Sequence, residues 1–359
     1  CMDNKIKILF ILPSLRPGGA ERVVSFIAQH LDKTKFESKL LIIGFKKKAV
    51  YSFENIETVF LNKSRVLLGV AGIFKAIKAF KPDIVMTSIA HLTMVTVFQS
   101  YFFRSTKFVS REANIKKVSQ QYHNEIPSFL GKILSKRSYK LLDLIVCQSK
   151  DMATELVELH PISKQKITIV NNPITKVFSS DINASFPATP NYVTVGRLHE
   201  VKGHCRILRA LSELDHEFTY TIIGKGNFKS VIVDKAKELN LMDKIIWIDF
   251  TNEVQKYLID SSVFIQGSYA EGFPNALLES CAVGTPVIAY NCLGGTSEIV
   301  EENINGFLIK SENELKNKLL DLKSNPMERA QVISSVMKKF SPEQIVSQYE
   351  KAFTNLATT

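Results

Sequence analysis

The chain has 359 residues, of which 45% are hydrophobic and 23% are charged, and it carries a formal net charge of +11. That length exceeds one ordinary core, so we expect two domains of a soluble globular protein. No apolar run reaches the roughly 18 residues of a membrane-spanning helix, and no signal-peptide apolar region opens the chain, which favours a cytoplasmic location. Reduced thiols are expected because no C-x-x-C pair occurs among Cys147, Cys205, Cys281 and Cys292.

Short apolar segments typical of strands alternate with helix-length stretches along the whole chain. The strand candidates of the first half are residues 7–12, 38–43, 83–88, 107–110, 144–149 and 166–170. Those of the second half are residues 191–195, 220–223, 244–248, 262–266, 286–289 and 306–309. Helical periodicity is clearest at 20–31, 202–214, 228–239 and 276–283. This alternation predicts an α/β protein with a mostly parallel sheet in each half, covered by helices on both faces.

The periodicity is interrupted between residues 171 and 190, where Asn-Asn-Pro, Ser-Ser-Asp and Pro-Ala-Thr-Pro occur. We therefore predict two Rossmann-like domains facing a cleft, one over residues 1–175 and one over residues 190–340. Residues 341–359 are expected to form a helix that packs back on the N-terminal domain. Ligands of such domains bind beyond the carboxyl ends of the strands.

Charge is divided unevenly between the two halves. Residues 1–180 contain 28 Lys and Arg against 13 Asp and Glu, whereas residues 181–359 contain 18 against 22. This asymmetry predicts an anionic partner for the N-terminal half, either nucleic acid or an anionic membrane face. The sequence has no zinc or helix-turn-helix signature and no pattern of interleaved basic and aromatic residues, so we favour the membrane.

The most informative segment is residues 268–280, Ser-Tyr-Ala-Glu-Gly-Phe-Pro-Asn-Ala-Leu-Leu-Glu-Ser. A buried strand is predicted before it and a helix after Pro274, which places Glu271 at a strand end and Glu279 on the inward side of the helix. The amides of residues 272–275 would point out of the helix N-terminus and favour an oxygen-rich or anionic ligand. Two carboxylates around such a turn suit a nucleotide-sugar. The plainer alternative is a solvated Glu at a helix start, worth ~0.3–1 kcal/mol.

Two glycine turns at predicted strand ends are candidates for phosphate or nucleotide contact. Gly18 and Gly19 follow the first strand and allow backbone N–H groups to approach a phosphate. Gly224 begins a turn that admits a nucleotide. Either turn is also explained by local geometry alone.

The loop after residues 191–195 contains a glycine and two cations. Gly196 keeps the strand end open, and Arg197 and Lys202 supply a planar fork of donors and a mobile point charge. The two cations can converge on a diphosphate, although either one alone is more simply a surface side chain.

In this order the motifs resemble those of the retaining glycosyltransferases of family 4, which have the two-domain GT-B fold. The matching motifs span nearly the whole chain and are Gly18-Gly19-Ala20-Glu21-Arg22, Asn171-Asn172-Pro173, Gly196-Arg197 with Lys202-Gly203, Glu271 to Glu279, and Gly284-Thr285-Pro286-Val287-Ile288 with Gly294-Gly295. The resemblance implies transfer of a sugar from a nucleoside-diphosphate donor, UDP being favoured, with retained anomeric configuration and without a metal or another cofactor. The implied acceptor is a glycan or a lipid-diphosphate-linked molecule of cell-surface polysaccharide synthesis.

The resemblance also implies a role for each matched residue. Arg197 and Lys202 would hold the diphosphate and form the catalytic set with Glu271, which would bind the donor sugar, while Glu279 would bind the ribose hydroxyls. Front-face attack with the leaving diphosphate as base is the implied mechanism, and its stabilisation by the two cations would supply much of the rate enhancement. The remaining donor-binding positions are Gly18, Gly19, Gly196, Gly224, Gly272, Phe273, Pro274 and Asn275.

Two segments depart from the family pattern. Many relatives have a histidine after the fourth strand of the N-terminal domain, where this chain has Arg111 and Glu112. These two residues are acceptor-side candidates, with a buried or rim ion pair as the alternative. His91 is a third candidate that is equally a structural histidine. Asp249 stands where relatives often have a glycine near the base, so the identity of the base stays open.

Residues 126–143 predict an amphipathic helix with basic residues on one side, at Lys132, Lys136, Arg137 and Lys140. Its apolar side comprises Phe129, Leu130, Ile133, Leu134, Leu141 and Leu142. Each cation near an anionic leaflet would add about 1 kcal/mol, and residues 66–81 would support the same face. We predict peripheral docking on the inner face of the plasma membrane. The alternative is a helix packed on its own sheet with a solvated basic side.

Two other classes of protein stay open. One is a non-catalytic protein that binds nucleotide-sugars or anionic lipids, and the other is a nucleotide-sugar epimerase of the GT-B fold. The intact set of Arg197, Lys202, Glu271 and Glu279 argues against loss of catalysis. An epimerase needs no acceptor surface, so the basic N-terminal half argues against it.

Overall fold

The computed structural model describes residues 5–16, 18–49, 55–113, 115, 129–176, 187 and 189–358. The chain divides into two compact units. Of the described residues, the N-terminal unit contains 5–16, 18–49, 55–113, 115, 129–175 and 342–358, and the C-terminal unit contains 176, 187 and 189–341. The chain therefore returns to the N-terminal unit for its last segment.

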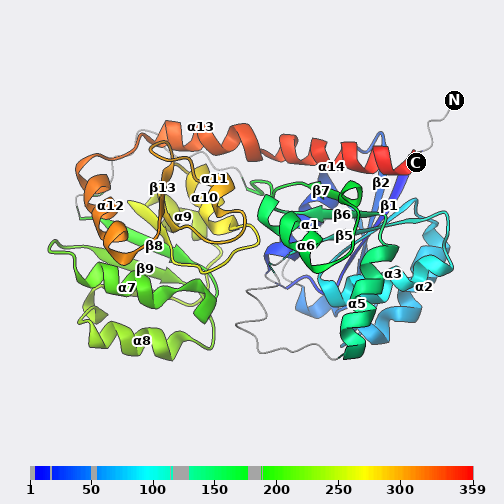
Figure 1. Cartoon of the computed structure of the whole chain (residues 1–359), viewed down its shortest axis with the longest axis horizontal. Helices are drawn as coiled ribbons and strands as arrows, with labels where there is room; N and C mark the ends of the chain where they lie inside the picture. Colours follow the sequence, from blue (N-terminus) through cyan, green and yellow to red (C-terminus); the bar gives the residue numbers. More distant parts are fainter. Residues whose placement is uncertain are drawn as a thin grey trace. The chain divides into compact units, whose positions relative to one another are not determined.

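The N-terminal unit is built on a parallel sheet with the strand order β3-β2-β1-β4-β5-β6-β7 (Figure 1). Its strands are β1 (Ile6–Leu12), β2 (Phe36–Ile42), β3 (Glu57–Phe60), β4 (Ile84–Ser88), β5 (Lys107–Arg111), β6 (Leu144–Cys147) and β7 (Ile167–Ile169). In the central register Ile8 lies opposite Ser38 on one side and Ile84 on the other. The sequence patterns missed β3, because this edge strand has alternating exposed positions and no apolar run.

Helices cover both faces of this sheet. They are α1 (Gly19–His30), α2 (Val70–Phe80), α3 (Ala90–Val97), α5 (Phe129–Leu141), α6 (Lys150–Leu159) and α14 (Pro342–Ala357). The short 3₁₀ turns are η1 (Lys46–Lys48), η2 (Val66–Gly69), η3 (Phe98–Tyr101) and η4 (Lys164–Lys166). Buried side chains of α2, α3, α5 and α6 share one core with Leu9 and Ile11. On the opposite face Phe10 meets Phe353 of α14 edge to face at 6.2 Å, and α14 also contacts α1.

The C-terminal unit has a second parallel sheet, in the order β10-β9-β8-β11-β12-β13. The strands are β8 (Asn191–Val195), β9 (Thr219–Ile223), β10 (Ile245–Ile248), β11 (Val263–Gln266), β12 (Val287–Tyr290) and β13 (Gly306–Ile309). The helices are α7 (His204–Ser212), α8 (Lys229–Glu238), α9 (Val254–Ile259), α10 (Asn275–Ala282), α11 (Thr296–Ile299), α12 (Glu312–Ser324) and α13 (Arg329–Phe340), with η5 (Glu200–Lys202) and η6 (Met242–Lys244). The prediction of two parallel Rossmann-like sheets is thus confirmed.

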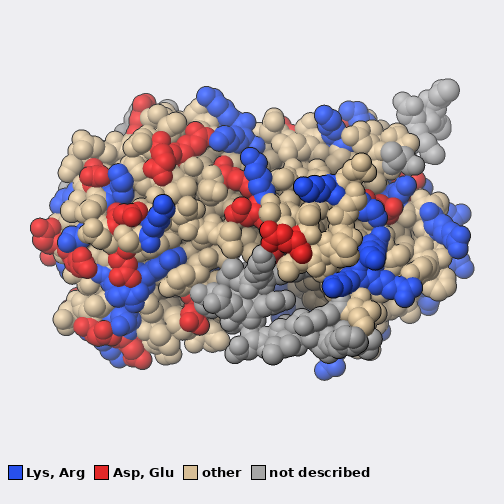
Figure 2. All heavy atoms as spheres, in the orientation of Figure 1, with Lys and Arg blue, Asp and Glu red and all other residues tan. Residues whose placement is uncertain are grey.

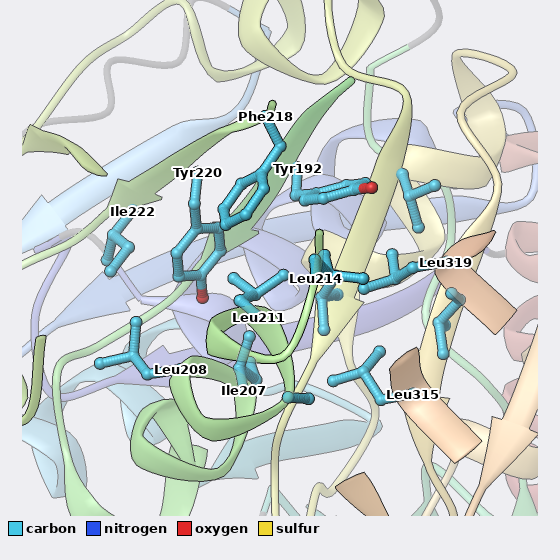
Figure 3. Packing of buried hydrophobic residues seen from close by; sticks show 14 of the residues in the cluster. Tyr192, Ile207, Leu208, Leu211, Leu214, Phe218, Tyr220, Ile222, Leu315 and Leu319 are labelled. Carbon is cyan, nitrogen blue, oxygen red and sulfur yellow. The ribbon is translucent and has the colours of Figure 1, made fainter. Parts of the chain in front are cut away.

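The core beside α7 fixes the strands that end at the candidate site. Figure 3 shows side chains of α7 pointing toward Tyr220 of β9 on one side and toward Leu315 of α12 on the other. Leu208 and Leu211 are fully buried there, and each such leucine stabilises the fold by about 1.5–3 kcal/mol. This packing holds the N-terminal end of α7 close to the carboxyl ends of β8 and β11.

The chain order reverses between β8 and β11, which are neighbours in the sheet. In an open α/β sheet this reversal is where ligands bind, beyond the carboxyl ends of the strands. The loops that follow β8, β9 and β11 therefore form the natural candidate site of the C-terminal unit. Over the residues that the structure describes, no helix has the length and apolarity that a membrane span requires.

Candidate functional site

The loops after β8 and β11 are joined backbone to backbone. Gly203 has a left-handed conformation with φ +62°, and a Cβ atom there would lie 1.8 Å from the carbonyl oxygen of Gly267. Tyr269 donates its backbone N–H to the carbonyl of Val201 at 2.8 Å. Only glycine permits so close an approach, so the Lys-Gly pair of the sequence motif serves to bring these loops together.

This contact places Lys202 against Glu271. The Nζ atom of Lys202 lies 2.6 Å from Oε1 of Glu271, and Ser268 donates its hydroxyl to the same oxygen at 2.5 Å. The side chains of Lys202 and Glu271 are 26% and 12% exposed, so the pair is shielded from water but open on one side. Lys202 was expected to bind the diphosphate of a donor and Glu271 its sugar. The structure brings these two side chains together although they are 69 positions apart in the chain.

Arg206 on α7 holds the same loop and was missed by the sequence patterns. Its Nε donates to the carbonyl of Gly267 at 2.7 Å, and a second guanidinium nitrogen donates to the carbonyl of Ser268. The guanidinium also lies over the rings of Tyr269 and Tyr290, at 4.0 and 3.6 Å from their centroids. Arg206 therefore fixes the loop that orients Glu271. One arginine on a helix face carries no signal, because its partners are carbonyls distant in the sequence.

Backbone proximity also explains the glycine that follows β9. Gly224 has a φ of +156°, and a Cβ atom on it would lie 1.8 Å from the carbonyl oxygen of Gly196. Gly196 itself has room, since the nearest atom to an added Cβ is Cε of Lys202 at 3.9 Å. The side chain of the adjacent Arg197 is exposed and pairs with no other residue in the described part of the chain. It is available to an anionic ligand.

The turn before α10 supplies fewer amide donors than the sequence suggested. Pro274 has no N–H, so only Gly272, Phe273 and Asn275 retain one. The ring of Phe273 is buried, with an edge-to-face contact to Phe340 at 5.6 Å, and it packs closely on Gly295. Phe273 and Pro274 can thus contact a sugar donor through backbone atoms and apolar surface, but not through polar side-chain groups.

Glu279 lies in α10 with 9% of its surface exposed, on the side of the helix that faces the interior. Its neighbours Leu278 and Ser280 are also buried. A carboxylate at this depth needs polar partners, which is consistent with a binding role and also with a structural one.

His204 follows Gly203 directly and is fully buried. Burial, and then the nearby charge of Lys202, lower the pKa of His204 to about 4. The imidazole is therefore neutral at physiological pH. A neutral ring allows the cationic Lys202 to lie close by without like-charge repulsion.

The glycine turn of the N-terminal unit begins α1. Gly18 precedes the helix, which starts at Gly19, and the carbonyl of Gly18 accepts from the N–H of Arg22 at 3.1 Å. The carboxylate of Glu21 folds back against Gly18, where an added Cβ would lie 2.2 Å from Oε2. Burial raises the pKa of Glu21. An anion can therefore bind at this helix end only when this carboxylate has moved away or has taken up a proton from solvent.

Arg111 is buried and has internal partners. It is 1% exposed, with Nε donating to the hydroxyl of Tyr349 at 3.2 Å and another guanidinium nitrogen donating to Oδ1 of Asn172. Asn172 in turn donates to Oε1 of Gln148 at 2.9 Å. The acceptor-side expectation for Arg111 is therefore not supported, because the guanidinium ties α14 and the Asn-Asn-Pro motif to the end of β5.

Glu112 is likewise interior, with 6% of its surface exposed. Its carboxylate accepts from the hydroxyl of Ser110 at 3.1 Å, and its backbone carbonyl accepts from Gln148 at 2.5 Å. Burial and the charge of Glu112 raise the pKa of Tyr139. The structure thus gives Glu112 internal partners in place of the expected acceptor contact.

His91 is the one acceptor-side candidate on an open surface. It is exposed at the start of α3 and lines a pocket of about 470 Å³ at the carboxyl edge of the N-terminal sheet. Lys63 and Arg65 line the same pocket, and apolar side chains including Val66 and Met94 form the rest of it. Loss of surrounding water lowers the pKa of His91, so the neutral form is favoured.

Two further features bear on the ligand. Asp249 is exposed at the end of β10, where an ion pair with Lys229 at 2.7 Å lowers its pKa. The ion pair of Asp249 with Lys229 lies at an edge strand and indicates no preference for one nucleotide base. In the described ranges, no three His, Cys, Asp or Glu side chains lie together as a metal site would require.

Comparison with known structures identifies the fold as GT-B, the two-domain glycosyltransferase architecture. The structure of Anabaena HepE in complex with UDP and glucose superposes with a TM-score of 0.81 at 17% identity, over 98% of this chain and 100% of that chain. Sucrose-phosphate synthase from Thermosynechococcus elongatus gives 0.80 at 16% identity, over 98% and 99% of the two chains. The fold prediction is thus confirmed.

The family follows from the sequence. Residues 17–176 match the profile "Glycosyltransferase Family 4" and residues 178–339 match "Glycosyl transferases group 1". The chain belongs to the group 1/family 4 glycosyltransferases, as its motifs predicted. It is 28% identical over 321 residues to the N-acetylgalactosamine-N,N'-diacetylbacillosaminyl-diphospho-undecaprenol 4-alpha-N-acetylgalactosaminyltransferase of Campylobacter jejuni, covering 86% of this chain and 87% of that protein. It is 23% identical to the lipopolysaccharide 1,6-galactosyltransferase of Escherichia coli K12, covering 84% of each.

Proposed function

We propose that the protein is a retaining glycosyltransferase that moves a sugar from a UDP-sugar to a glycan or lipid-diphosphate-linked acceptor in cell-surface polysaccharide synthesis. The observation that carries the proposal is the paired Lys202 and Glu271 beside the exposed side chain of Arg197, at the strand-order reversal of the C-terminal unit. A fold neighbour that binds UDP and glucose supports the donor, and a relative that acts on a diphospho-undecaprenol supports the acceptor.

In this proposal the C-terminal unit is the donor side. Arg197 and Lys202 bind the diphosphate, Glu271 binds the donor sugar, and Glu279 binds the ribose. Negative charge develops on the diphosphate as the glycosidic bond breaks, and cations that are already positioned stabilise it without reorganisation. The leaving diphosphate accepts the proton of the attacking hydroxyl on the same face, which retains the configuration.

The N-terminal unit is the acceptor side. The pocket lined by His91, Lys63 and Arg65 combines cations with apolar walls, which suits a phosphorylated lipid carrier better than a free sugar. Lys63 and Arg65 are exposed and pair with no other side chain in the described ranges, so both can bind phosphate oxygens.

The same unit would dock on the inner face of the plasma membrane. Lys136, Arg137 and Lys140 are exposed along α5, and Ile133 of its predicted apolar side is 46% exposed. The side chains of Lys132, Phe129 and Leu130 lie outside the described residues. Figure 2 shows mostly Lys and Arg on the visible face of the N-terminal unit and more Asp and Glu on the C-terminal unit.

Donor turnover measured with and without a lipid-diphosphate-linked acceptor tests this function. We expect acceptor-dependent release of UDP and a product of retained configuration. Thermal shift with a set of nucleotide-sugars selects the donor first, because a bound donor stabilises by RT ln(1 + [L]/Kd). Epimerised donor without acceptor would indicate the epimerase, and binding without any turnover would indicate a non-catalytic protein.

The two carboxylates separate donor-sugar from nucleotide binding. Glu271→Ala should lower kcat because the sugar loses its position, whereas Glu279→Ala should chiefly weaken binding of free UDP. Equal UDP affinity in Glu279→Ala and the wild type would contradict the ribose assignment. Activity should be unchanged by EDTA, since the proposed chemistry rests on Arg197 and Lys202.

A further inference from the structure

Exposed apolar side chains gather on the outer side of the α2–α3–α5 layer of the N-terminal unit. Phe102 is 73% exposed and Leu67 is 71% exposed, and Leu68 and Tyr101 are 58% and 49% exposed. We call these four residues the apolar patch. A lone exposed leucine needs no explanation, but several large side chains together indicate an interaction site.

Three contacts hold the two parts of the patch together. The ring of Phe102 meets Phe74 of α2 edge to face at 5.8 Å. Gln99 of η3 donates to the carbonyl of Val70, the first residue of α2, at 3.5 Å, and Phe103 packs on Phe74 at 4.8 Å. The 3₁₀ turn η2, which carries Leu67 and Leu68, runs directly into α2. Since these contacts join η3 and Phe102 to α2, Tyr101 and Phe102 lie close to η2.

A basic helix borders the patch. Arg137 of α5 donates to the hydroxyl of Tyr101 at 3.2 Å, and α5 contacts both η3 and α3. Residues 61–107 contain seven Lys and Arg against one acidic residue, and residues 129–142 contain four against none. The patch is thus surrounded by cations, with a tyrosine paired to an arginine at its border.

We propose that the apolar patch inserts into an anionic lipid bilayer and anchors the N-terminal unit there. Leucine and phenylalanine side chains enter the acyl region, the tyrosine and its arginine lie at the headgroup level, and the surrounding cations bind anionic headgroups. A protein partner would also cover apolar side chains, but the excess of cations around the patch complements an anionic surface. The patch adds a hydrophobic anchor to the electrostatic adsorption proposed for α5.

The position of the patch relates it to the acceptor. Leu67 also lines the pocket of His91, Lys63 and Arg65, so patch and pocket are continuous at η2. A phosphorylated lipid whose chain stays in the bilayer could thus present its head group to the pocket without leaving the membrane. This second step rests on the proposed function, whereas membrane insertion does not.

Vesicle co-sedimentation of the whole chain without donor or acceptor tests insertion. Wild-type protein should bind phosphatidylglycerol-containing vesicles and retain part of this binding at about 1 M salt, where charges are screened within ~3 Å. Leu67→Ser, Leu68→Ser and Phe102→Ser together should lower the partition coefficient at least about tenfold and abolish the salt-resistant part. Ile246→Ser with Phe250→Ser, at 48% and 57% exposure in the C-terminal unit, is the matched control and should bind as wild type.

A single-tryptophan probe tests the depth of insertion directly. Trp247 is the only tryptophan, so Phe102→Trp in a Trp247→Phe background reports from the patch alone. Its emission should shift to the blue on vesicles and be quenched by lipids brominated on the acyl chains. Phe250→Trp in the same background should show neither change.

Two outcomes would overturn the proposal. One is equal vesicle binding by the triple variant and the wild type, with an unchanged far-UV circular dichroism spectrum showing that both are folded. The other is a wild-type dimer in sedimentation velocity that the triple variant converts to monomer, because the patch would then be a protein interface. Acceptor-dependent turnover on a detergent-soluble acceptor should persist in a Leu68→Ser, Phe102→Ser double variant, which leaves the lining of the pocket intact, so failure of insertion and failure of the proposed function are told apart.

Discussion

The two units offer their ligands very different surfaces. In the C-terminal unit the candidate donor site is tied together before any ligand arrives, since Lys202, Ser268 and Arg206 all bind the loop that carries Glu271. In the N-terminal unit Lys63 and Arg65 stand exposed at a pocket and have no counter-ion in the described ranges. The contrast indicates that one unit is preorganised for a small polar ligand, while the other is completed by the partner that it binds.

This difference has a chemical reason. Stabilising the charge of a leaving group requires groups that are fixed beforehand, because reorganisation during the reaction would raise the barrier. In the proposed function the N-terminal unit binds an acceptor and stabilises no leaving group, so this requirement does not apply to it.

Removing the cation of the preorganised site should have the largest effect. Lys202→Ala should lower kcat/KM roughly 30–10³-fold, equivalent to ~2–4 kcal/mol of transition-state stabilisation, because the diphosphate loses a positioned charge and Glu271 loses its partner. Lys229→Ala removes a cation from an exposed ion pair of similar length in the same unit and serves as the control. Near-wild-type activity of an Arg197→Ala, Lys202→Ala double variant would refute the diphosphate assignment.

Acid should weaken the C-terminal unit through His204. Its pKa is about 4 in the folded protein and ~6.5 when unfolded, so the unfolded state binds more protons between these values and stability falls as pH drops from about 6.5 to about 4. At pH 5 the loss from this group should be about 2 kcal/mol. Denaturant unfolding at pH 7.5 and 5.0 should show this loss in the wild type and not in His204→Leu. His30→Leu, at an exposed position on α1, is the control, and an equal loss in His204→Leu would contradict the assignment.

Loosening the loop should reduce turnover without changing the binding groups. Arg206→Lys keeps the charge but loses the fork that binds two carbonyls, so kcat should fall by about 1–2 kcal/mol, or roughly 5–30-fold, with little change in UDP affinity. Arg209→Lys, on the same helix and paired with Glu312, is the matched control. A role in binding alone would instead weaken UDP affinity and leave kcat intact.

The smallest effect on turnover is expected for substitutions in the pocket of Lys63, Arg65 and His91. Lys63→Ser and Arg65→Ser should each raise KM for a short-chain lipid-diphosphate acceptor by about threefold, because exposed single charges contribute little, and kcat should be unchanged. Lys75→Ser, an exposed cation on α2, should leave KM unchanged. An effect as large as that of Lys202→Ala would show that the acceptor side is as preorganised as the donor side.

Much of the fold was predictable because its signals are local. Every strand expected in the second half is present, with ends that move by a single residue; for example, 191–195 and 306–309 coincide with β8 and β13. Edge strand β3 was missed because half of its side chains face solvent and leave no apolar run. Lys202 and Glu271 were found because each lies in a recognisable motif, but nothing in the sequence showed that the two touch.

Arg111 and Glu112 show that local sequence patterns do not predict which charged side chains become buried. Arg111 and Glu112 carry the polar chemistry of a site, yet Arg111 contacts Tyr349, 238 positions away. Whether a charged side chain faces ligand or interior depends on the segment that packs over it, and that segment can lie anywhere in the chain. Arg206 was missed for the same reason, since its partners are backbone carbonyls whose identity leaves no trace in the sequence.

The alternation of strands and helices, the family and the glycines that permit close backbone contact could all be predicted from the sequence, because periodicity and glycine conformation act over a few residues. The packed structure was needed to show that Arg206 fixes the loop of Glu271, that Arg111 has internal partners, and that η2 and η3 carry the residues of the apolar patch. These arrangements depend on which strand ends and helix faces become neighbours in space, a property of the sheet order and the packed core as a whole.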